Sequence, residues 1–420
     1  MGADVVVIGL GYVGLPLALE AARSGLRVLG HDTDPEVVAA LNAGDSHVDD
    51  LDDADLAHLL ANGFSASADP SVIAEAEVVV ICVPTPLSDD GGPDLSAVVA
   101  ATGAVAAHLR PGTVVVLEST TYPGTTEELV VPMLEHGSGL RAGADFHVAF
   151  SPERIDPGNP VHGLRNTPKV VGGHTPACTE RASAFYSRFV DTVVPAKGTR
   201  EAETAKLLEN TYRHINIALV NEMVQFTHEL GIDLWDVIEL ASTKPFGFQA
   251  FRPGPGVGGH CIPIDPNYLS HNVRSRLGYP FRFVELAQEI NDRMPTYVAR
   301  RAQEILNDDG LAVNGARVLL LGVTYKPDIA DQRGAAAVPL ARALTRLGAS
   351  IEFHDPLVES WQFDDRVMSR VPDLEATVTE VDLVILVQDH RRYEIDRLAD
   401  LSRRFFDTRG RVTAPGAVRL

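Results

Sequence analysis

The chain has 420 residues, of which 45% are hydrophobic and 22% are charged, and its formal net charge is −21. Because domains usually hold about 100–200 residues, this length predicts two or three domains with substantial cores. No run approaches the roughly 18 apolar residues that cross a bilayer, and the negative charge argues against broad binding to nucleic acid or to anionic membranes. Small anionic ligands are not excluded, because backbone amides and a few basic side chains hold them locally.

The start of the chain favours a protein of the cytoplasm. The opening four residues lead straight into an apolar run, with neither the basic start nor the cleavage site of a signal peptide. The three cysteines, Cys82, Cys178 and Cys261, are too few and too scattered for a disulfide framework or a zinc site. We therefore expect no metal, and each thiol is judged by its own neighbourhood.

The first third of the chain alternates short β-branched runs with helical stretches. Such runs are typical of buried parallel strands, and their alternation with helices predicts a doubly wound α/β domain. The predicted strands are Val5–Ile8, Arg27–Gly30, Val78–Cys82, Val114–Leu117 and His147–Phe150.

The middle of the chain is predicted to be helical. Residues 199–230 form one stretch without Gly or Pro, and apolar residues lie on more than one face of its second half. This pattern indicates a helix buried at a domain junction or in a subunit interface. A Pro/Gly-rich segment, residues 244–266, follows, and it is too apolar for a disordered linker.

The last third of the chain returns to an α/β pattern. Three runs are typical of strands: Arg317–Leu321, Ser350–Phe353 and Leu383–Val387. They are separated by Ala/Leu-rich segments that are typical of helices, such as Val338–Leu347. We therefore expect a second, smaller α/β domain at this end.

The first predicted strand is followed at once by Gly9-Leu10-Gly11-Tyr12-Val13-Gly14, which opens a helix. In a dinucleotide site, Gly9 permits the tight turn, Gly11 lets the backbone approach the pyrophosphate, and Gly14 lets helix and strand pack closely. Asp32 ends the next strand, about 20 residues on, where it accepts hydrogen bonds from a ribose diol and repels a 2′-phosphate. The pattern predicts NAD rather than NADP, and the alternative is a tight turn without a ligand.

Two further loops follow predicted strands at their carboxyl ends, where ligands bind in such sheets. They are residues 83–86, which contain Thr85, and residues 118–124, which contain Thr120. Both threonines are candidate cofactor contacts. The alternative is that Ser, Thr, Pro and Gly serve only to form turns.

The most unusual stretch is residues 254–266, with four glycines in its first six residues and Cys261 near its middle. Such a backbone can wrap a phosphate or a sugar, and Asp265 stands four residues after the thiol. A reactive thiol needs partial exposure and positive potential. The alternative for any lone cysteine is a small buried hydrophobe, which suits Cys82 and Cys178 well.

Three further side chains are candidate partners of this thiol. Lys206 and Asn210 stand four residues apart in the predicted helix, so they share one face and can hold an oxyanion or a water. The alternative is a solvated face, because Glu203 and Glu209 are close by in the sequence. Glu153, just after the last predicted strand of the first domain, is available as a base or a substrate contact.

On these motifs the chain resembles the nucleotide-sugar 6-dehydrogenases, the family of the UDP-glucose, UDP-N-acetylglucosamine and UDP-N-acetylmannosamine dehydrogenases. The resemblance covers essentially the whole length, because the motifs occur in the order of the family. They are the glycine fingerprint, Glu118-Ser-Thr, Ser151-Pro-Glu, Lys206-x-x-x-Asn210, Gly-Gly-x-Cys261 with Asp265, Gly322-x-x-Tyr325-Lys326 and Asp407-x-Arg409.

The resemblance implies two Rossmann-like, doubly wound parallel-sheet domains joined by a long helical central domain. Its expected boundaries are an NAD-binding domain over 1–198, a helical dimer-forming domain with the cysteine loop over 199–308, and a nucleotide-sugar-binding domain over 309–420. It also implies a homodimer through the central helix, in a pathway of polysaccharide biosynthesis.

The resemblance also assigns roles to matching residues. Cys261 resembles the nucleophile, and Lys206, Asn210 and Asp265 resemble the groups that steer protons and stabilise oxyanions. The expected catalytic set is completed by Glu153 and Thr120. The expected cofactor contacts are Gly9, Gly11, Tyr12, Val13, Gly14, Asp32, Thr85, Thr120 and Arg333, and the expected substrate contacts are Glu153, Arg154, Lys206, Asn210, Arg252, Gly258, Lys326 and Arg409.

The implied reaction is a four-electron oxidation of a primary alcohol. One hydride leaves C6 to give an aldehyde, Cys261 adds to form a thiohemiacetal, a second hydride transfer gives a thioester, and water releases the acid. His260 before the thiol and Ile262-Pro263-Ile264 after it resemble the N-acetylhexosamine branch, whereas UDP-glucose enzymes usually have Ser before and Phe-Pro-Lys after. UDP-glucose or another nucleotide-linked hexose is the alternative substrate.

The sequence departs from the family at one place. The usual Asp-x-Arg-Glu-Ser-Pro is Asp331-Gln332-Arg333 followed by Gly334 to Ala337 here, so cofactor-side contacts or domain closure are expected to differ. This departure keeps open a non-catalytic regulator that binds NAD and a nucleotide sugar. A second alternative is a single-hydride dehydrogenase of a hydroxy acid, which needs no cysteine loop.

Overall fold

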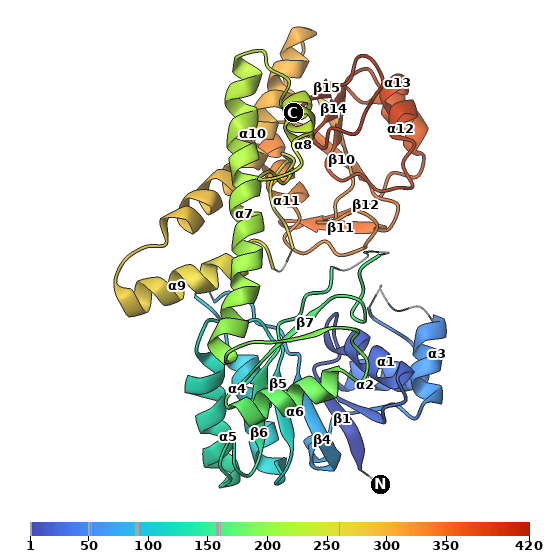
Figure 1. The fold of residues 1–420 in the computed structure, drawn as a ribbon. Helices are drawn as coiled ribbons and strands as arrows, with labels where there is room; N and C mark the ends of the chain where they lie inside the picture. Colours follow the sequence, from blue (N-terminus) through green and yellow to red (C-terminus); the bar gives the residue numbers. More distant parts are fainter. Residues whose placement is uncertain are drawn as a thin grey trace. The chain divides into compact units, whose positions relative to one another are not determined.

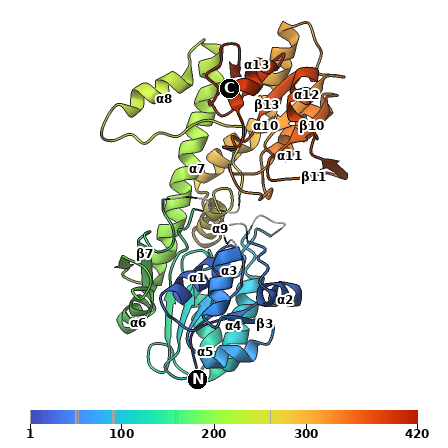
Figure 2. The ribbon, with the colours of Figure 1, turned by 90° about the vertical axis from the view of Figure 1, so that its right-hand side faces the viewer.

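The computed structural model describes residues 2–48, 51, 53–88, 92–156, 159, 161–259 and 261–420. The chain folds into two compact units. The first unit consists of Met1–Glu209 with Asn267–Tyr279, and the second of Asn210–Pro266 with Pro280–Leu420 (Figures 1 and 2). Each unit is built around its own parallel sheet.

The β-branched runs of the first unit form one sheet. Among the described residues it has eight strands in the order β3-β2-β1-β4-β5-β6-β7-β8, and every neighbouring pair is parallel except β6 with β7. The first six strands have the order of a dinucleotide-binding domain. The strands are β1 Ala3–Ile8, β2 Val28–His31, β3 Ser65–Ser67, β4 Ala76–Ile81, β5 Val114–Leu117, β6 His147–Phe150, β7 Lys169–Gly173 and β8 Val193–Pro195.

Alternate residues of β1 face opposite sides of this sheet, so both faces are covered by helices. Val5 and Val7 pack in a buried cluster with α1, α3 and α6, whereas Val6 and Ile8 pack in another with α4 and α5. The helices are α1 Gly14–Arg23, α2 Pro35–Ala43, α3 Asp53–Ala61, α4 Ser96–His108, α5 Val131–Ser138 and α6 Pro176–Tyr186, with a 3₁₀ turn η1 Pro70–Glu75 and a π-turn η2 Thr126–Val130.

Two helices complete the first unit. Helix α7 Thr199–Glu229 is continuous, and its residues up to Glu209 belong to the first unit while the rest belong to the second. Helix α9 Asp265–Leu277 returns to the first unit from a later part of the chain. The Tyr268 hydroxyl of α9 donates to the carbonyls of Thr85 and Pro86, and Arg276 pairs with Glu128.

The second unit has a smaller sheet. Among the described residues it holds five parallel strands in the order β10-β9-β13-β14-β15, beside an antiparallel hairpin β11–β12. Val318 and Leu320 of β9 pack with α10 and α11, and Leu319 and Leu321 pack with α12 and α13, so this sheet is also covered on both faces.

The bounds of the second unit's elements follow in chain order. They are α8 Leu234–Ser242, α10 Arg282–Asp308, β9 Arg317–Leu321, α11 Ala337–Arg346, β10 Ser350–His354, β11 Ser360–Phe363, β12 Arg366–Ser369, α12 Leu374–Glu380, β13 Leu383–Leu386, α13 Ile395–Leu401, β14 Phe405–Asp407 and β15 Val418–Arg419.

The expected α/β architecture with two doubly wound parallel sheets and a long central helix is confirmed. Small differences lie at strand ends. Strand β2 is shifted by one residue from the predicted Arg27–Gly30, β4 ends one residue before the predicted Cys82, and β1 and β4 each start two residues earlier than predicted. The domain boundaries at 198 and 308 stay a prediction. Within the described residues, no helix is both long enough and apolar enough to cross a bilayer.

Candidate active site

The turn after β1 has the features expected of a dinucleotide site. Gly9 has φ +87°, and a Cβ there would lie 2.8 Å from the Cys82 carbonyl oxygen. A Cβ on Gly14 would lie 2.0 Å from the Gly9 carbonyl oxygen, so helix α1 packs against the turn only with glycine in that position. At Gly11, a Cβ would lie in open space among the described atoms, which leaves this backbone accessible to a ligand.

Asp32 follows β2 directly and is held in place by two backbone amides. Its carboxylate accepts hydrogen bonds from the Leu10 amide at 2.9 Å and from the Asp34 amide at 3.1 Å. Because the side chain remains half-buried, its other lone pairs can accept from a ribose diol. Tyr12 and Val13 pack partly buried against the core at the start of α1.

The loops after β4 and β5 are tied to neighbouring elements. Thr85 and Thr120 are both half-buried. The Thr85 carbonyl accepts from the Tyr268 hydroxyl, and the Ser119 hydroxyl donates to the Val83 carbonyl at 2.8 Å, which joins the two loops. These contacts explain how the loops are ordered at the carboxyl edge of the sheet, and the cofactor role of the two threonines stays a prediction.

A buried charged network includes Glu118 of the loop after β5, and the sequence analysis did not predict it. The Lys169 ammonium of β7 donates to the Glu118 carboxylate at 2.8 Å and lies 3.6 Å from the Glu153 carboxylate, and the Tyr186 hydroxyl donates to Glu118. Burial raises the pKa of Glu118 although Lys169 favours its charged form. Burial opposes the charge of Lys169, but the two carboxylates outweigh it, and its pKa is raised.

The face of α7 that carries Lys206 is buried, so the alternative of a solvated face is wrong for this residue. The Lys206 ammonium donates to the Glu153 carbonyl at 2.5 Å. Glu203, one turn earlier, is also buried and accepts from the Gly124 amide at 2.6 Å and from the amide and hydroxyl of Thr126. Burial raises the pKa of Glu203, and its hydrogen bonds fix α7 to the loop after β5.

In the second unit, the cysteine loop brings three of the predicted residues together. Cys261 is exposed, and its carbonyl accepts from the Asp265 amide at 2.8 Å, where the chain turns into α9. The buried Asp265 carboxylate accepts from the Asn210 side-chain amide at 2.5 Å. His260 lies outside the described residues, as do Pro157 and Gly158 of the predicted Ser151–Asn159 motif.

The other two thiols are buried, as expected for small hydrophobic side chains. Burial raises the pKa of Cys82 well above its ordinary value, which keeps that thiol protonated and unreactive. Cys178 lies in α6 beside the Thr175 hydroxyl at 3.1 Å. Of the three, only Cys261 is accessible to a substrate.

The glycines of the cysteine loop are required by close packing. A Cβ on Gly258 would lie 2.6 Å from the Gly334 carbonyl oxygen, and one on Gly259 would lie 2.9 Å from the Tyr325 ring. Ala335 and Ala336 are buried, and Ala336 lies 3.3 Å from the Cβ position of Gly256. The departure from the family pattern at 334–337 therefore gives small residues that pack directly against the cysteine loop.

The remaining predicted residues are basic side chains in different surroundings. Arg154 of the first unit pairs with Glu209 at 2.6 Å. In the second unit, Arg252 and Arg333 are exposed, and Arg333 forms a bidentate pair with Asp331. Lys326 is half-buried in the loop after β9, and Arg409, after β14, donates to the Val387 carbonyl at 2.7 Å. Their roles toward substrate or cofactor stay predictions.

Family models match three successive parts of the chain. The UDP-glucose/GDP-mannose dehydrogenase family matches with its NAD binding domain over residues 3–190, its central domain over 200–293 and its UDP binding domain over 319–414. The chain belongs to the UDP-glucose/GDP-mannose dehydrogenase family. It is thus an NAD-dependent nucleotide-sugar dehydrogenase, as the sequence analysis expected, and the hydroxy-acid alternative is not supported.

Relatives and solved structures in the family agree with this assignment. The chain is similar to the UDP-N-acetyl-D-glucosamine 6-dehydrogenase of Pseudomonas aeruginosa, with 38% identity over 85% of this chain and 83% of the relative. It is also similar to the structure of a UDP-D-ManNAc dehydrogenase from Pyrococcus horikoshii, with 32% identity and a TM-score of 0.89 over 99% and 98% of the two chains. A UDP-glucose dehydrogenase from Pyrobaculum islandicum gives 28% identity and a TM-score of 0.88 over 100% and 97%, so the fold does not distinguish the sugars.

Proposed function

We propose that this enzyme oxidises the C6 alcohol of UDP-N-acetylglucosamine or UDP-N-acetylmannosamine to the uronic acid, with Cys261 as covalent catalyst. The observation that carries the proposal is the arrangement of an exposed Cys261 beside Asp265, with Asn210 hydrogen-bonded to that aspartate. Lys206 stands one helical turn from Asn210 on α7, and its ammonium is already held at the Glu153 carbonyl.

The residues of the first unit fit NAD. Gly9, Gly11 and Gly14 leave a backbone cradle at the start of α1, and Asp32 has lone pairs for a ribose diol. When bound, NAD supplies the hydride acceptor for each of two successive oxidations. Asp32 would repel a 2′-phosphate, which favours NAD over NADP.

The chemistry of the substrate follows from the cysteine. The alcohol loses a hydride and a proton to become an aldehyde, and the Cys261 sulfur adds to its carbon to give a thiohemiacetal. Loss of a second hydride and proton gives a thioester, and water then breaks the C–S bond, so that the carboxylate leaves and the thiol is restored. One sugar acid therefore requires two NAD and one water.

The roles of the neighbouring residues follow from charge. An oxyanion forms when the sulfur adds and again when water attacks the thioester. The Lys206 ammonium and the Asn210 amide are donors that can stabilise it, and Asp265 is the carboxylate that can take up or steer a proton. Glu153 is a substrate-side carboxylate in this proposal, and Thr120 belongs to the catalytic set and contacts the cofactor. Arg154, Arg252, Gly258, Lys326 and Arg409 complete the substrate contacts.

The sugar is proposed from the cysteine loop and from the relatives. Of the three relatives named above, two act, by their names, on UDP-N-acetyl-D-glucosamine and on UDP-D-ManNAc, with 38% and 32% identity to this chain, and the third, with 28% identity, acts on UDP-glucose. His260 and Ile262 beside the thiol agree with that branch. A panel of UDP-N-acetylglucosamine, UDP-N-acetylmannosamine and UDP-glucose, with NADH absorbance as the readout, tests the choice, and a clear preference for UDP-glucose would contradict it.

The four-electron mechanism is tested by stoichiometry and by the thiol. We expect two NADH for each sugar acid, and Cys261→Ala should stop acid formation, whereas Cys178→Ala, at a buried thiol, should not. One NADH with an aldehyde product would contradict the mechanism. Binding of NAD and UDP-sugar that raises Tm without any NADH would instead favour the non-catalytic regulator.

We also propose a homodimer through α7 and a cytoplasmic location. Helix α7 carries a stripe of apolar side chains, each between 47% and 68% exposed, at a spacing of four or seven residues that keeps them on one face. The stripe consists of Leu208, Tyr212, Leu219 and Phe226 in the helix and of Leu230, which directly follows its last residue. A second copy of the chain is the expected partner, and the cytoplasm is proposed because its NAD pool would serve two oxidations per sugar.

A further inference from the structure

The turn after β9 in the second unit repeats the geometry of the turn after β1 in the first. Gly322 has φ +79°, as Gly9 has φ +87°, and each glycine directly follows the first strand of its sheet. The Gly322 amide donates to the His354 carbonyl at 2.9 Å, and the Gly9 amide donates to the His31 carbonyl at the same distance. Both turns are therefore fixed in the same way to the end of the next strand.

A carboxylate directly follows that next strand in both units. Asp355 accepts from the Val323 amide at 2.8 Å and from the Leu357 amide at 2.9 Å. Asp32 accepts from the corresponding amides of its own unit, those of Leu10 and Asp34. Asp355 is thus the counterpart, in the second unit, of the residue that faces the ribose in a dinucleotide site.

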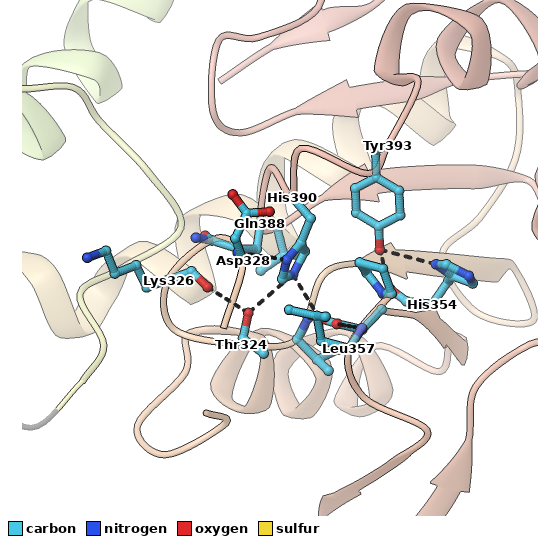
Figure 3. Close-up of polar contacts among 12 residues, drawn as sticks. Thr324, Lys326, Asp328, His354, Leu357, Gln388, His390 and Tyr393 are labelled. Carbon is cyan, nitrogen blue, oxygen red and sulfur yellow. Dashed lines mark hydrogen bonds and ion pairs between the residues drawn. The ribbon is translucent and has the colours of Figure 1, made fainter. Parts of the chain in front are cut away.

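The two carboxylates differ in what else they contact. Asp32 is half-buried, whereas Asp355 is fully buried beneath His390, whose Nε2 lies 3.0 Å from its Oδ2. His390 comes from the loop after β13 and lies over the turn after β9 (Figure 3). Asp355 therefore has an imidazole as a further partner, whereas the half-buried Asp32 keeps lone pairs for a ribose diol.

The hydrogen bonds of His390 define its tautomer. The Asp328 amide donates to Nδ1 at 3.0 Å, so Nδ1 must be an acceptor. The ring proton is then on Nε2, which faces Asp355 and lies 3.2 Å from the Thr324 hydroxyl oxygen. That hydroxyl donates to the Lys326 carbonyl at 2.9 Å, so one imidazole contacts both ends of the segment 324–328 (Figure 3).

The segment 324–328 adopts a shape that needs support. Asp328 has φ +63°, which non-glycine residues rarely adopt, and its carboxylate accepts from the Arg391 amide at 3.0 Å and from the Arg391 guanidinium at 2.6 Å. The segment carries Lys326 and directly follows β9. In the sheet, β9 lies between β10 and β13, and the strand order reverses at this point. Nucleotides bind at this point of parallel sheets.

We propose that His390 is a positioning residue that holds the segment 324–328 in the shape that binds the UDP group, acting through the Asp328 amide and Thr324, with Asp355 as its anchor. This inference rests on the proposed function, in which Lys326 contacts the nucleotide sugar. It assigns His390 a role in nucleotide affinity and none in the oxidation itself.

The first experiment measures UDP binding to the full chain by titration calorimetry. We expect His390→Ala to raise the Kd for UDP about tenfold or more, because the segment loses a contact at each end, and to leave the Kd for NAD unchanged. Tyr393→Phe is the matched control: its hydroxyl donates at 2.7 Å to the His354 carbonyl, which belongs to the same buried cluster and lies outside the segment 324–328. We expect it to keep the UDP affinity of the unaltered enzyme.

Two conservative variants separate positioning from stability. In His390→Asn the side-chain oxygen takes the place of Nδ1 and keeps the contact to Asp328, whereas in His390→Gln the amide takes the place of Nε2 and keeps the contact to Asp355. We therefore expect the Asn variant to bind UDP the more tightly of the two, and the Gln variant to have the higher Tm. A purely structural role predicts that affinity follows Tm.

The possible results separate a failure of the proposed function from a failure of the role proposed for His390. An unaltered enzyme that binds no UDP would overturn the proposed function together with this inference. If the unaltered enzyme binds UDP but His390→Ala binds it as well as Tyr393→Phe does, the inference alone is wrong. If His390→Ala fails to fold, the Asn and Gln variants decide, and tighter UDP binding by Gln than by Asn would overturn the inference.

Discussion

At the scale of single residues, buried ionisable side chains couple the stability of this protein to pH. His214 of α7 is fully buried, and burial lowers its pKa to about 4 from an ordinary 6.5. Between these two values the unfolded chain takes up a proton on this imidazole and the folded chain does not. The contribution of neutral His214 to stability is therefore complete above pH 6.5 and is lost as the pH falls toward 4.

His214→Gln should weaken this acid sensitivity. The expected difference is at most about 3 kcal/mol in the change of unfolding free energy between pH 7 and pH 4. Urea denaturation at a series of pH values measures it. His136→Gln, at an exposed histidine of α5, serves as the control, and equal pH profiles for both variants would contradict the prediction.

Lys169 lies beside two buried carboxylates, Glu118 and Glu153, so its removal should be costly. Lys169→Met is expected to lower the unfolding free energy by about 3–5 kcal/mol, because Glu118 and Glu153 lose their counter-charge. Adding Glu118→Gln should recover part of that loss by removing one uncompensated charge. The exposed pair of Arg165 with Asp191 is the comparison, where Arg165→Met should change stability by less than about 1 kcal/mol.

The site residues that could be predicted from the sequence are those that belong to short local motifs. The loop of Cys261 and Asp265 and the spacing of Lys206 and Asn210 were visible in short stretches, and the structure brings Cys261, Asp265 and Asn210 together. The Lys169 network was not visible, because its partner Glu118 is 51 positions away and a charged residue is ordinarily exposed.

At the scale of elements, the cysteine loop depends on close packing of its glycines. Gly258→Ala should lower stability by about 1–3 kcal/mol, because the new methyl would overlap the Gly334 carbonyl and the Tyr325 side chain. Gly103→Ala, at an exposed position inside α4, should instead raise stability by about 0.5–1 kcal/mol. Thermal unfolding of both variants tests the pair, and a neutral Gly258→Ala would contradict the packing described above.

The strands that sequence reasoning found differ physically from those it missed. The central strands are β-branched runs buried on both faces, such as Val114–Leu117, and their bounds were predicted to within two residues. The edge strand β3, Ser65–Ser67, has no β-branched residue, and β7 ends in two glycines. Strands with so few β-branched residues or with terminal glycines are defined by the neighbour they pair with, which the local sequence does not record.

At the scale of the whole molecule, the proposed dimer makes a prediction for α7. Leu219→Glu places a charge in the centre of the exposed apolar stripe and should shift the protein toward monomer. Arg213→Glu introduces the same side chain on the same helix, off the stripe, and should not. Light scattering after size-exclusion chromatography measures both masses, and a monomeric unaltered protein would contradict the proposal.

The overall architecture could be predicted from the sequence more completely than the site or the strand ends. Periodicity alone predicted two α/β regions with a helix between them, because each buried strand and helix contributes a run of its own. The assignment of α9 to the first unit was not predictable, because it depends on contacts such as those of Tyr268 with Thr85 and Pro86 across more than 180 positions.

That return of α9 has a consequence for how the protein is made. The first unit is not complete when Glu209 leaves the ribosome, because residues 267–279 are still to be synthesised. At bacterial or eukaryotic elongation rates the roughly 70 intervening residues take on the order of 4–14 s, during which the loop after β4 lacks its hydrogen bonds from Tyr268. The nascent NAD-binding unit should therefore be sensitive to protease and to chaperones until α9 has emerged.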